Sequence, residues 1–153
     1  TDPENKVKSI ALIDFDHADS DWHPGAYSTD HSCYGTLRFN APETLLGQYC
    51  AGSDLYSVGG ILYLLMTGKM SQPDELFEQA RCEDADEQGD VKRSRSWLRS
   101  LYRLIQENPI DWLCDPWPEL PECKSFCSQL LGFSPEERFG SAEQALRHPW
   151  LSM

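Results

Sequence analysis

The sequence predicts a mainly helical α+β domain in which one short strand precedes about five helices. Three observations support this prediction. The 153 residues include 40% hydrophobic and 25% charged residues, an ordinary globular composition that suffices for one core. Apolar residues alternate near the N-terminus, whereas later apolar positions recur at helical spacing. Proline, glycine and capping residues mark the expected helix ends.

Charge and residue usage exclude several classes of protein. The 13 Lys and Arg residues against 25 Asp and Glu residues give a formal net charge of −12, which argues against binding to nucleic acid or to an anionic membrane. The longest mostly apolar stretch, residues 55–66, is too short to cross a bilayer. The N-terminus lacks the pattern of a secretory signal, so an intracellular, cytoplasmic location is expected and the nucleus stays open. The six scattered cysteines predict free thiols.

Residues 7–15 (VKSIALIDF) are expected to form a short buried strand. Their apolar side chains fall on both alternating sets, which is typical of a strand that is covered on both faces. From Asp16 to Asn40 the chain is polar and has no sustained period, so a long loop is expected. Loops of this length in compact domains are usually functional or mobile.

The next segment predicts a helix that begins near Ser53 or Asp54 and ends at Gly68. Either residue can cap a helix start, and glycine is the usual stop. The segment is apolar nearly all round, which predicts a helix at the centre of the core. Gly59 and Gly60 each cost a helix about 1 kcal/mol relative to alanine, so we expect another backbone to approach closely there.

Two segments of opposite charge follow. Residues 74–90 are acidic with few apolar positions, so residues 74–92 are expected to form a solvated helix end and an exposed connector. Residues 93–107 predict an amphipathic helix with an arginine at every fourth position and an apolar side made of Trp97, Leu98, Leu101, Leu104 and Ile105. Its basic face is compatible with a calmodulin target, but burial of the apolar side within the domain is the preferred interpretation.

The C-terminal part predicts a proline-rich segment and then two further helical regions. Residues 109–121 combine four prolines with two tryptophans, which predicts a packed irregular segment. Residues 122–131 predict a helix that ends at Gly132. Capping-box patterns begin at Ser134 and Ser141, and the last helix must end before Pro149.

Four runs of residues stand in an informative order. They are LIDFD at 12–16, YGTLRFNAPE at 34–43, SDLYSVGGILYLLMTGK at 53–69 and LLGFSPEERFGSAEQALRHPWL at 130–151. In this order they resemble the C-terminal lobe of eukaryotic serine/threonine protein kinases, and the resemblance covers nearly the whole chain. It implies the helical C-terminal lobe of a protein-kinase-like fold, with the N-terminal lobe absent.

The resemblance also divides the chain. Residues 1–153 would form a partial protein kinase domain. Within it, residues 7–43 would hold the metal-binding strand and loop and the activation segment, and residues 53–68 the central helix. Residues 74–92 would form the exposed connector, and residues 93–151 the C-terminal helices.

Individual residues match functional positions of the family. Asp14, in Asp14-Phe15-Asp16, resembles the metal-binding aspartate and is the candidate ligand for Mg²⁺ and, with it, ATP. Taken alone, an aspartate after a strand is more often a turn or cap residue. Gly35 and Thr36 resemble the loop that contacts the substrate chain. Ser32 resembles the activating phosphorylation position, although such hydroxyls also suit an ordinary polar loop.

Three further matches are structural. Glu43 closes Ala-Pro-Glu, and Arg138 falls where the family has an arginine that pairs with this glutamate. The resemblance therefore implies a bidentate ion pair that ties the loop end to the helical core. Asp54 opens the family's D-x-x-S-x-G pattern at the start of the central helix.

The chain departs from the family pattern at two points. The glycine-rich loop, the lysine and the His-Arg-Asp catalytic loop precede Asp-Phe-Gly in the family, whereas only 13 residues precede Asp14 here. No catalytic residue is therefore assigned, and the catalytic aspartate would lie upstream of this chain. Asp16 stands where the family has glycine, which restricts pivoting of the loop and adds a negative charge beside Asp14.

The leading prediction is part of a protein serine/threonine kinase that transfers the γ-phosphate of ATP to protein Ser and Thr hydroxyls. ATP and Mg²⁺ would bind only together with the upstream part, and this chain alone would be inactive. The expected partners are a protein substrate and the N-terminal kinase lobe or a complementing chain. The alternative is a non-catalytic, pseudokinase-like module for protein interaction.

Overall fold

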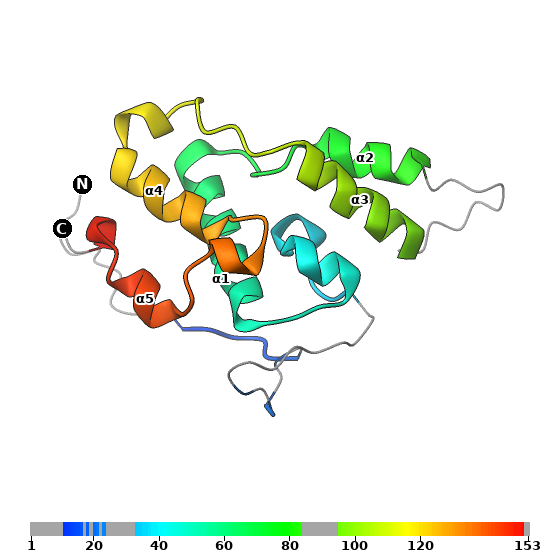
Figure 1. The fold of residues 1–153 in the computed structure, drawn as a ribbon, viewed down its shortest axis with the longest axis horizontal. Coiled ribbons are helices and arrows are strands. Elements are labelled where there is room, and N and C mark those ends of the chain that lie inside the picture. The colour runs from blue at the N-terminus through cyan, green and yellow to red at the C-terminus, as the bar shows by residue number, and fades with distance from the viewer. Residues whose placement is uncertain are drawn as a thin grey trace.

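The computed structural model describes residues 11–16, 18, 20, 21, 23, 33–83 and 95–151. Within these ranges the chain is mainly helical, as predicted, and contains no strand. The helices are α1 (Ala51–Thr67), α2 (Asp74–Glu83), α3 (Arg95–Glu107), α4 (Pro121–Leu130) and α5 (Ala142–Leu146). Figure 1 shows α1 beside α4 in the middle of the molecule, with the antiparallel pair α2 and α3 at one end and α5 at the other.

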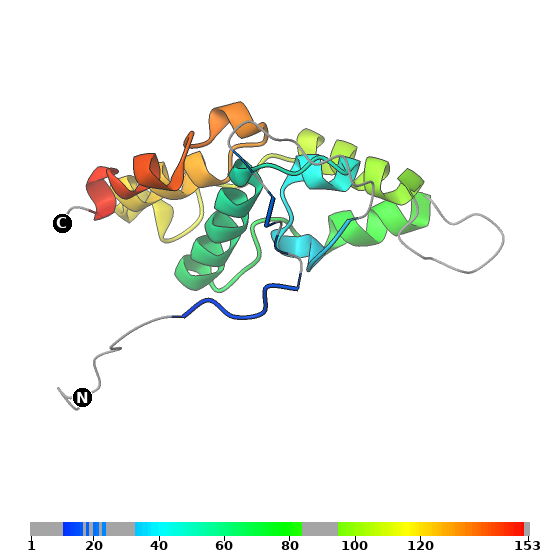
Figure 2. The same ribbon diagram turned by 90° about the horizontal axis from the view of Figure 1, so that it is seen from below.

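Short 3-10 helices connect these elements. They are η1 (Leu37–Phe39), η2 (Pro42–Leu46), η3 (Trp117–Glu119), η4 (Pro135–Glu137) and η5 (Pro149–Leu151). Figure 2, seen from below, shows η1 and η2 in cyan between α1 and the pair α2 and α3. This position makes the 37–46 segment a bridge between the two ends of the fold.

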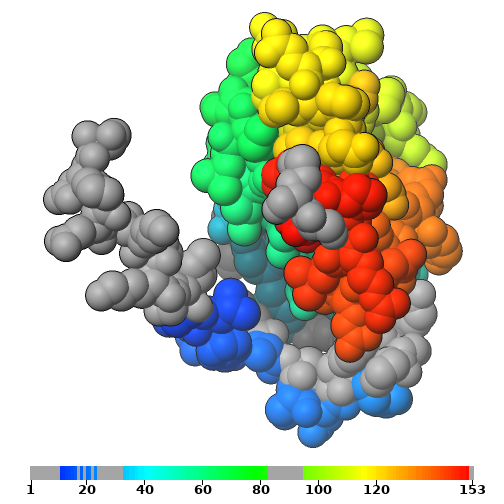
Figure 3. Space-filling view, turned by 90° about the vertical axis from the view of Figure 1, so that its left-hand side faces the viewer, coloured from blue at the N-terminus to red at the C-terminus, as the bar shows by residue number. Residues whose placement is uncertain are grey.

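The predicted strand over residues 7–15 is wrong where the structure describes it. Residues 11–15 have no regular structure, and Leu12 and Ile13 are 83% and 82% exposed. Figure 3 shows the blue residues 11–16 at the margin of the molecule. A strand needs neighbouring strands to pair its backbone groups, and the described residues supply none. Residues 7–10 lie outside the described residues.

Helix α1 begins at Ala51, earlier than the predicted start at Ser53 or Asp54. Ser53 acts from inside the first turn, where its Oγ accepts a hydrogen bond from the Cys50 backbone N–H at 3.1 Å. The helix ends as predicted at Gly68, which adopts a left-handed conformation with φ 70°. Side chains cannot easily follow that conformation, which is why the stop falls on glycine.

The prediction that α1 lies fully inside the core is wrong. Its buried side carries small and aromatic residues, but Val58, Ile61 and Leu65 on the opposite side are 51%, 50% and 76% exposed. The described residues cover only one side of the helix. At Gly59 an added Cβ would lie 2.8 Å from Cβ of Leu130, so close approach is real, although side chains rather than backbone cause it.

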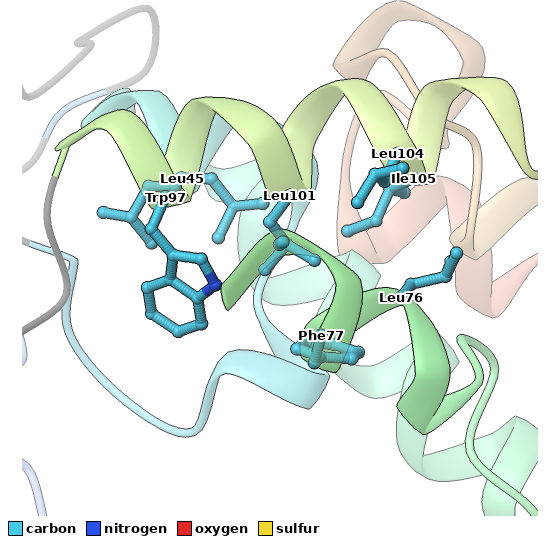
Figure 4. Packing of buried hydrophobic residues seen from close by; sticks show 9 residues of the cluster. Leu45, Leu76, Phe77, Trp97, Leu101, Leu104 and Ile105 are labelled. Carbon is cyan, nitrogen blue, oxygen red and sulfur yellow. The ribbon is translucent and has the colours of Figure 1, made fainter. Parts of the chain in front are cut away.

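Helices α2 and α3 enclose the first hydrophobic cluster. Figure 4 shows apolar side chains of α3 pointing toward Leu76 and Phe77 of α2 and toward Leu45 of η2. The residues that periodicity placed on the inner side of α3 are all buried, namely Trp97, Leu98, Leu101, Leu104 and Ile105. This burial contradicts the calmodulin-target interpretation, because a calmodulin-bound helix must offer its apolar side to the partner.

Residues 74–92 were expected to form a solvated helix end and an exposed connector; the first part is indeed helical, but the expectation that it is fully solvated is wrong. Residues 74–83 form α2, which buries Leu76, Phe77 and Ala80 against α3. The many acidic residues concealed three apolar positions that lie on one helical face. Residues 84–92 lie outside the described residues, as do residues 93 and 94 at the expected start of α3.

The second cluster surrounds Trp117, which is fully buried against Tyr63 and Trp112, with ring centroids 5.3 Å and 5.1 Å away. The proline-rich segment is therefore packed and irregular, as predicted. Ser134 and Glu137 form the predicted capping box around a single 3-10 turn rather than a longer helix.

All six cysteines are free thiols. In the described part of the chain, no helix is both long enough and apolar enough to span a membrane.

Candidate functional site

The structure brings Glu43 and Arg138 together. Glu43 lies in η2, and Arg138 follows η4, 95 positions later in the sequence. Arg138 donates from Nη1 to Oε1 and from Nη2 to Oε2 of Glu43, each at 2.7 Å. The side chains of Arg138 and Glu43 are 0% and 8% exposed. The pair is therefore bidentate and shielded from solvent, the geometry in which guanidinium and carboxylate interact most strongly.

Backbone carbonyl groups satisfy the rest of the Arg138 guanidinium. Nε donates to Gly132 O at 2.8 Å, Nη1 to Gly52 O at 2.9 Å and Nη2 to Phe133 O at 2.9 Å. Together with the two bonds to Glu43, these contacts use all five N–H donors of arginine. One side chain thus joins the start of α1, the turn after α4 and the end of the 33–43 loop.

Two residues of α1 complete the surroundings of the ion pair. Ser53 Oγ donates a hydrogen bond to Glu43 Oε1 at 2.8 Å. The Arg138 guanidinium lies over the Tyr56 ring, 4.9 Å from its centroid. Burial raises the pKa of the Tyr56 hydroxyl to about 12. Sequence reasoning missed both contacts, although Ser53 was expected at the start of the predicted helix and Tyr56 within it.

The loop that resembles the substrate-contacting loop is held by polar contacts. Gly35 has φ 81° and is exposed, and Thr36 precedes η1 and is also exposed. The Asn40 side chain donates to Tyr34 O at 2.7 Å, and the Tyr34 backbone N–H donates to Tyr49 Oη at 3.0 Å. Asn40 therefore closes the loop around Gly35. The sequence contained no signal that pointed to Asn40.

Contacts from η1 tie this loop to two helices. Ser57 Oγ of α1 donates to Phe39 O at 2.9 Å. Arg38 forms an ion pair with Asp74 of α2, and its guanidinium lies 4.7 Å from the centroid of the Phe77 ring. The loop is consequently anchored on both sides, even though its outer surface at Gly35 and Thr36 stays open to solvent.

The remaining predicted site residues do not gather around the ion pair. Asp14 and Asp16 are exposed, and Asp14 adopts φ 66°, a conformation that aspartate tolerates better than most residues. Asp54 is exposed as a residue, but partial burial of its carboxyl group raises its pKa. Among the residues that the structure describes, no group of three or more His, Cys, Asp or Glu side chains could hold a metal ion. Ser32 lies outside the described residues.

Two kinds of comparison with known proteins agree with each other. Residues 2–151 match the model of the protein kinase domain. Serine/threonine-protein kinase H1 of Mus musculus is 34% identical over 119 residues, which cover 76% of this chain and 23% of that protein. Serine/threonine-protein kinase H2 of Homo sapiens is 31% identical over 144 residues, 93% of this chain and 31% of that protein.

A plant relative matches the chain to a similar extent. Calcium-dependent protein kinase 4 of Arabidopsis thaliana is 33% identical over 131 residues, 85% of this chain and 21% of that protein. The chain thus spans between about a fifth and a third of the length of these three relatives.

Proposed function

Because this chain belongs to the protein kinase family, we propose that it is part of a protein serine/threonine kinase that transfers the γ-phosphate of ATP to Ser or Thr hydroxyls of a protein substrate. The relatives that it resembles are serine/threonine kinases by name. The whole enzyme would use residues of this chain to fix the activation segment and to present the substrate-contacting loop.

The observation that carries this proposal is the buried ion pair between Glu43 and Arg138. It anchors the end of the 33–43 loop to the helical core through five hydrogen bonds, so that the backbone before Glu43 starts from a fixed point. A loop that must position a hydroxyl for phosphoryl transfer needs such an anchor, because catalysis of this reaction rests mainly on positioning and charge stabilisation.

The exposed apolar side of α1 supports the proposal that a further kinase segment packs on this chain. Val58, Ile61 and Leu65 recur at positions i, i+3 and i+7, which places them on one helical face. Large apolar residues in such a row are normally buried. The N-terminal lobe or a complementing chain is the partner that we propose, and on this basis the 153 residues alone would not transfer phosphate.

Asp14 fits the role of a Mg²⁺ ligand in the complete enzyme. Its carboxylate is exposed, and carboxylate oxygens are ligands that Mg²⁺ prefers. Bound Mg²⁺ would supply charge neutralisation at the β- and γ-phosphates of ATP. Asp14 itself would hold the ion at one carboxylate, and the remaining ligands would come from outside the described residues.

Asp16 favours a second candidate function, a kinase-like module that binds proteins without catalysis. Glycine at this position allows the loop to pivot, whereas aspartate restricts it and adds a second negative charge two residues from Asp14. This change would alter the metal site or abolish it. The two candidates differ in whether the full-length protein transfers phosphate.

The test compares full-length protein with its Asp14→Asn variant. Mg²⁺ and ATP at a hundredfold excess over Kd are expected to stabilise the wild-type protein by about 2.7 kcal/mol and therefore to raise its Tm. Asp14→Asn should remove this gain, whereas the matched Glu78→Gln variant, at an exposed position of α2, should keep it. The wild-type protein should also transfer labelled phosphate from ATP to a peptide that contains Ser or Thr. Nucleotide binding without transfer would favour the non-catalytic module, and absence of both would contradict the assignment of Asp14.

A further inference from the structure

Helix α3 carries a basic outer face on an acidic protein. Residues 91–106 contain no acidic residue, although the whole chain has a formal net charge of −12. Arg95, Arg99 and Arg103 are all exposed and follow one another at intervals of four residues. A merely solvated helix face usually mixes both signs of charge, which is not the pattern here.

The orientation of this face is fixed by the packing of α3. The opposite side of the helix is buried against α2 and η2, so the three arginines cannot rotate inward. Within the described part of the chain, neither Arg95 nor Arg99 forms an ion pair. Arg103 is already paired with Glu107 at 3.1 Å, with both side chains about half exposed, so Arg95 and Arg99 are the main binding groups of this face.

A hollow of about 320 Å³ borders the same helix. Leu46, Tyr102, Phe133 and Pro135 form its apolar wall, whereas Glu43, Gln48, Ser134 and Glu136 line its polar side. Tyr102 lies three residues after Arg99 and directly before Arg103, so the hollow opens beside the basic face. Positive charge next to a hollow with an apolar wall suits a segment that is acidic along the arginines and apolar at the end beside the hollow, where Glu136 disfavours a carboxylate.

We propose that the outer face of α3, defined by Arg95, Arg99 and Arg103, together with the adjoining hollow, binds an extended acidic segment of a partner protein. Positions i and i+4 of a helix lie about 6 Å apart along its axis. Alternate residues of an extended chain lie about 6.6 Å apart and point to the same side. The segment therefore carries Asp or Glu at every second position and an apolar residue at one end.

The charge of the chain selects a protein segment over other anions. Nucleic acids and anionic membranes present long arrays of charge and bind to broad basic surfaces. Here the basic face is confined to one helix, and the net charge of −12 repels an extended polyanion. A short acidic segment carries fewer charges than these polyanions and therefore meets less of this repulsion. The proposal does not depend on the kinase function, because binding is measured without nucleotide.

The test is fluorescence anisotropy of a labelled twelve-residue peptide added to the full-length protein. The probe has Asp or Glu at alternate positions and one terminal Leu. Arg95→Gln/Arg99→Gln should weaken its binding about tenfold, because two exposed ion pairs at up to about 1 kcal/mol each are lost. Glutamine keeps a high helix propensity, and circular dichroism checks that α3 remains folded.

Matched controls separate a specific surface from general electrostatics. Lys69→Gln/Arg147→Gln removes two exposed cations elsewhere and should change Kd less than twofold, within the range expected for distant charges. A peptide of the same composition with all its acidic residues adjacent should bind more weakly than the probe.

Three results would overturn the proposal. They are equal losses of affinity in the two double variants, equal affinity for the two peptides, and tighter binding of a single-stranded oligonucleotide of matched charge. The last result would assign the face to phosphate rather than to a protein carboxylate. If the Arg95→Gln/Arg99→Gln variant unfolds, the single variant Arg99→Gln decides by the same comparison with Arg147→Gln.

Discussion

Replacement of Glu43 by glutamine tests whether the ion pair with Arg138 anchors the fold. The substitution keeps the size of the side chain but removes the charge and turns one acceptor into a donor that faces Nη2 or Nη1 of Arg138. The guanidinium, which is 0% exposed, would then remain buried without a counter-ion. We therefore expect the free energy of unfolding to fall.

The contacts of Arg138 set the magnitude of this loss. Removal of one partner from a buried pair costs about 3–5 kcal/mol, because the other charge is left uncompensated. After Glu43→Gln the carbonyl groups of Gly52, Gly132 and Phe133 still receive hydrogen bonds and partly stabilise the cation. The expected loss is therefore near the lower end, about 3 kcal/mol.

Arg138→Met should cost more, about 5 kcal/mol, because it leaves the Glu43 carboxylate with Ser53 as its remaining donor and three carbonyl groups without the donor that they share. Most domains are stable by only about 5–15 kcal/mol, so this second variant approaches the limit of folding. The order of the two losses, with arginine above glutamate, follows directly from the number of bonds that each side chain makes.

Urea unfolding followed by tryptophan fluorescence measures both losses. The control is Glu107→Gln, which breaks the pair with Arg103, whose side chains are 49% and 55% exposed. That pair should contribute less than about 0.5 kcal/mol and nothing measurable in 1 M NaCl, whereas the effect at Glu43 should persist in salt. A loss below about 1 kcal/mol for Glu43→Gln, or one no larger than for the control, would refute the reasoning.

Two further predictions concern α1. Gly59→Ala should lower the free energy of unfolding by about 1–2 kcal/mol in the same assay, although alanine has the better helix propensity. The reason is that the new Cβ would lie 2.8 Å from Cβ of Leu130 and 2.9 Å from Cγ of Leu131. Unchanged stability would show that α4 can move away. Burial holds the pKa of Tyr56 at about 12, so the folded protein keeps a proton that the unfolded chain loses above about pH 10. The stability that depends on this protonated hydroxyl is fully present below pH 10, and it falls by about 1.4 kcal/mol per pH unit as the pH rises from 10 to 12. Unfolding measured at several pH values should therefore show that the free energy of unfolding declines less steeply with pH for Tyr56→Phe than for the wild-type protein.

Periodicity predicted local elements well where one pattern dominated. The inner side of α3 was recognisable because its five apolar residues fall on one face, and each of them is buried. The buried face of α2 was not predicted, because acidic residues surround Leu76, Phe77 and Ala80 in the sequence. The strand expected over residues 7–15 fails because alternation describes only the preference of a segment, whereas pairing needs a second strand.

The contacts of the candidate site were likewise predictable from the sequence only in part. The order of the motifs predicted that Glu43 and Arg138 meet, and the distances between them agree. The contributions of Gly52, Gly132 and Phe133 were not predictable, because they act through backbone carbonyl groups that any residue possesses. The exposure of one side of α1 was not predicted either. Apolar composition indicates that a helix face is favourably buried, but it does not indicate which segment covers that face.

The position of η2 explains why one ion pair matters for the whole described fold. Ala41, just before η2, packs in the cluster around Trp117, whereas Leu45 packs in the cluster between α2 and α3. Glu43 lies between these two residues and is bound to Arg138, which itself contacts the start of α1 and the turn after α4. The two clusters therefore share a short connection whose direction Arg138 fixes. If the ion pair is broken, η2 can no longer hold Ala41 and Leu45 against their two clusters at the same time. Replacement of Glu43 should therefore destabilise α3 as well as α1.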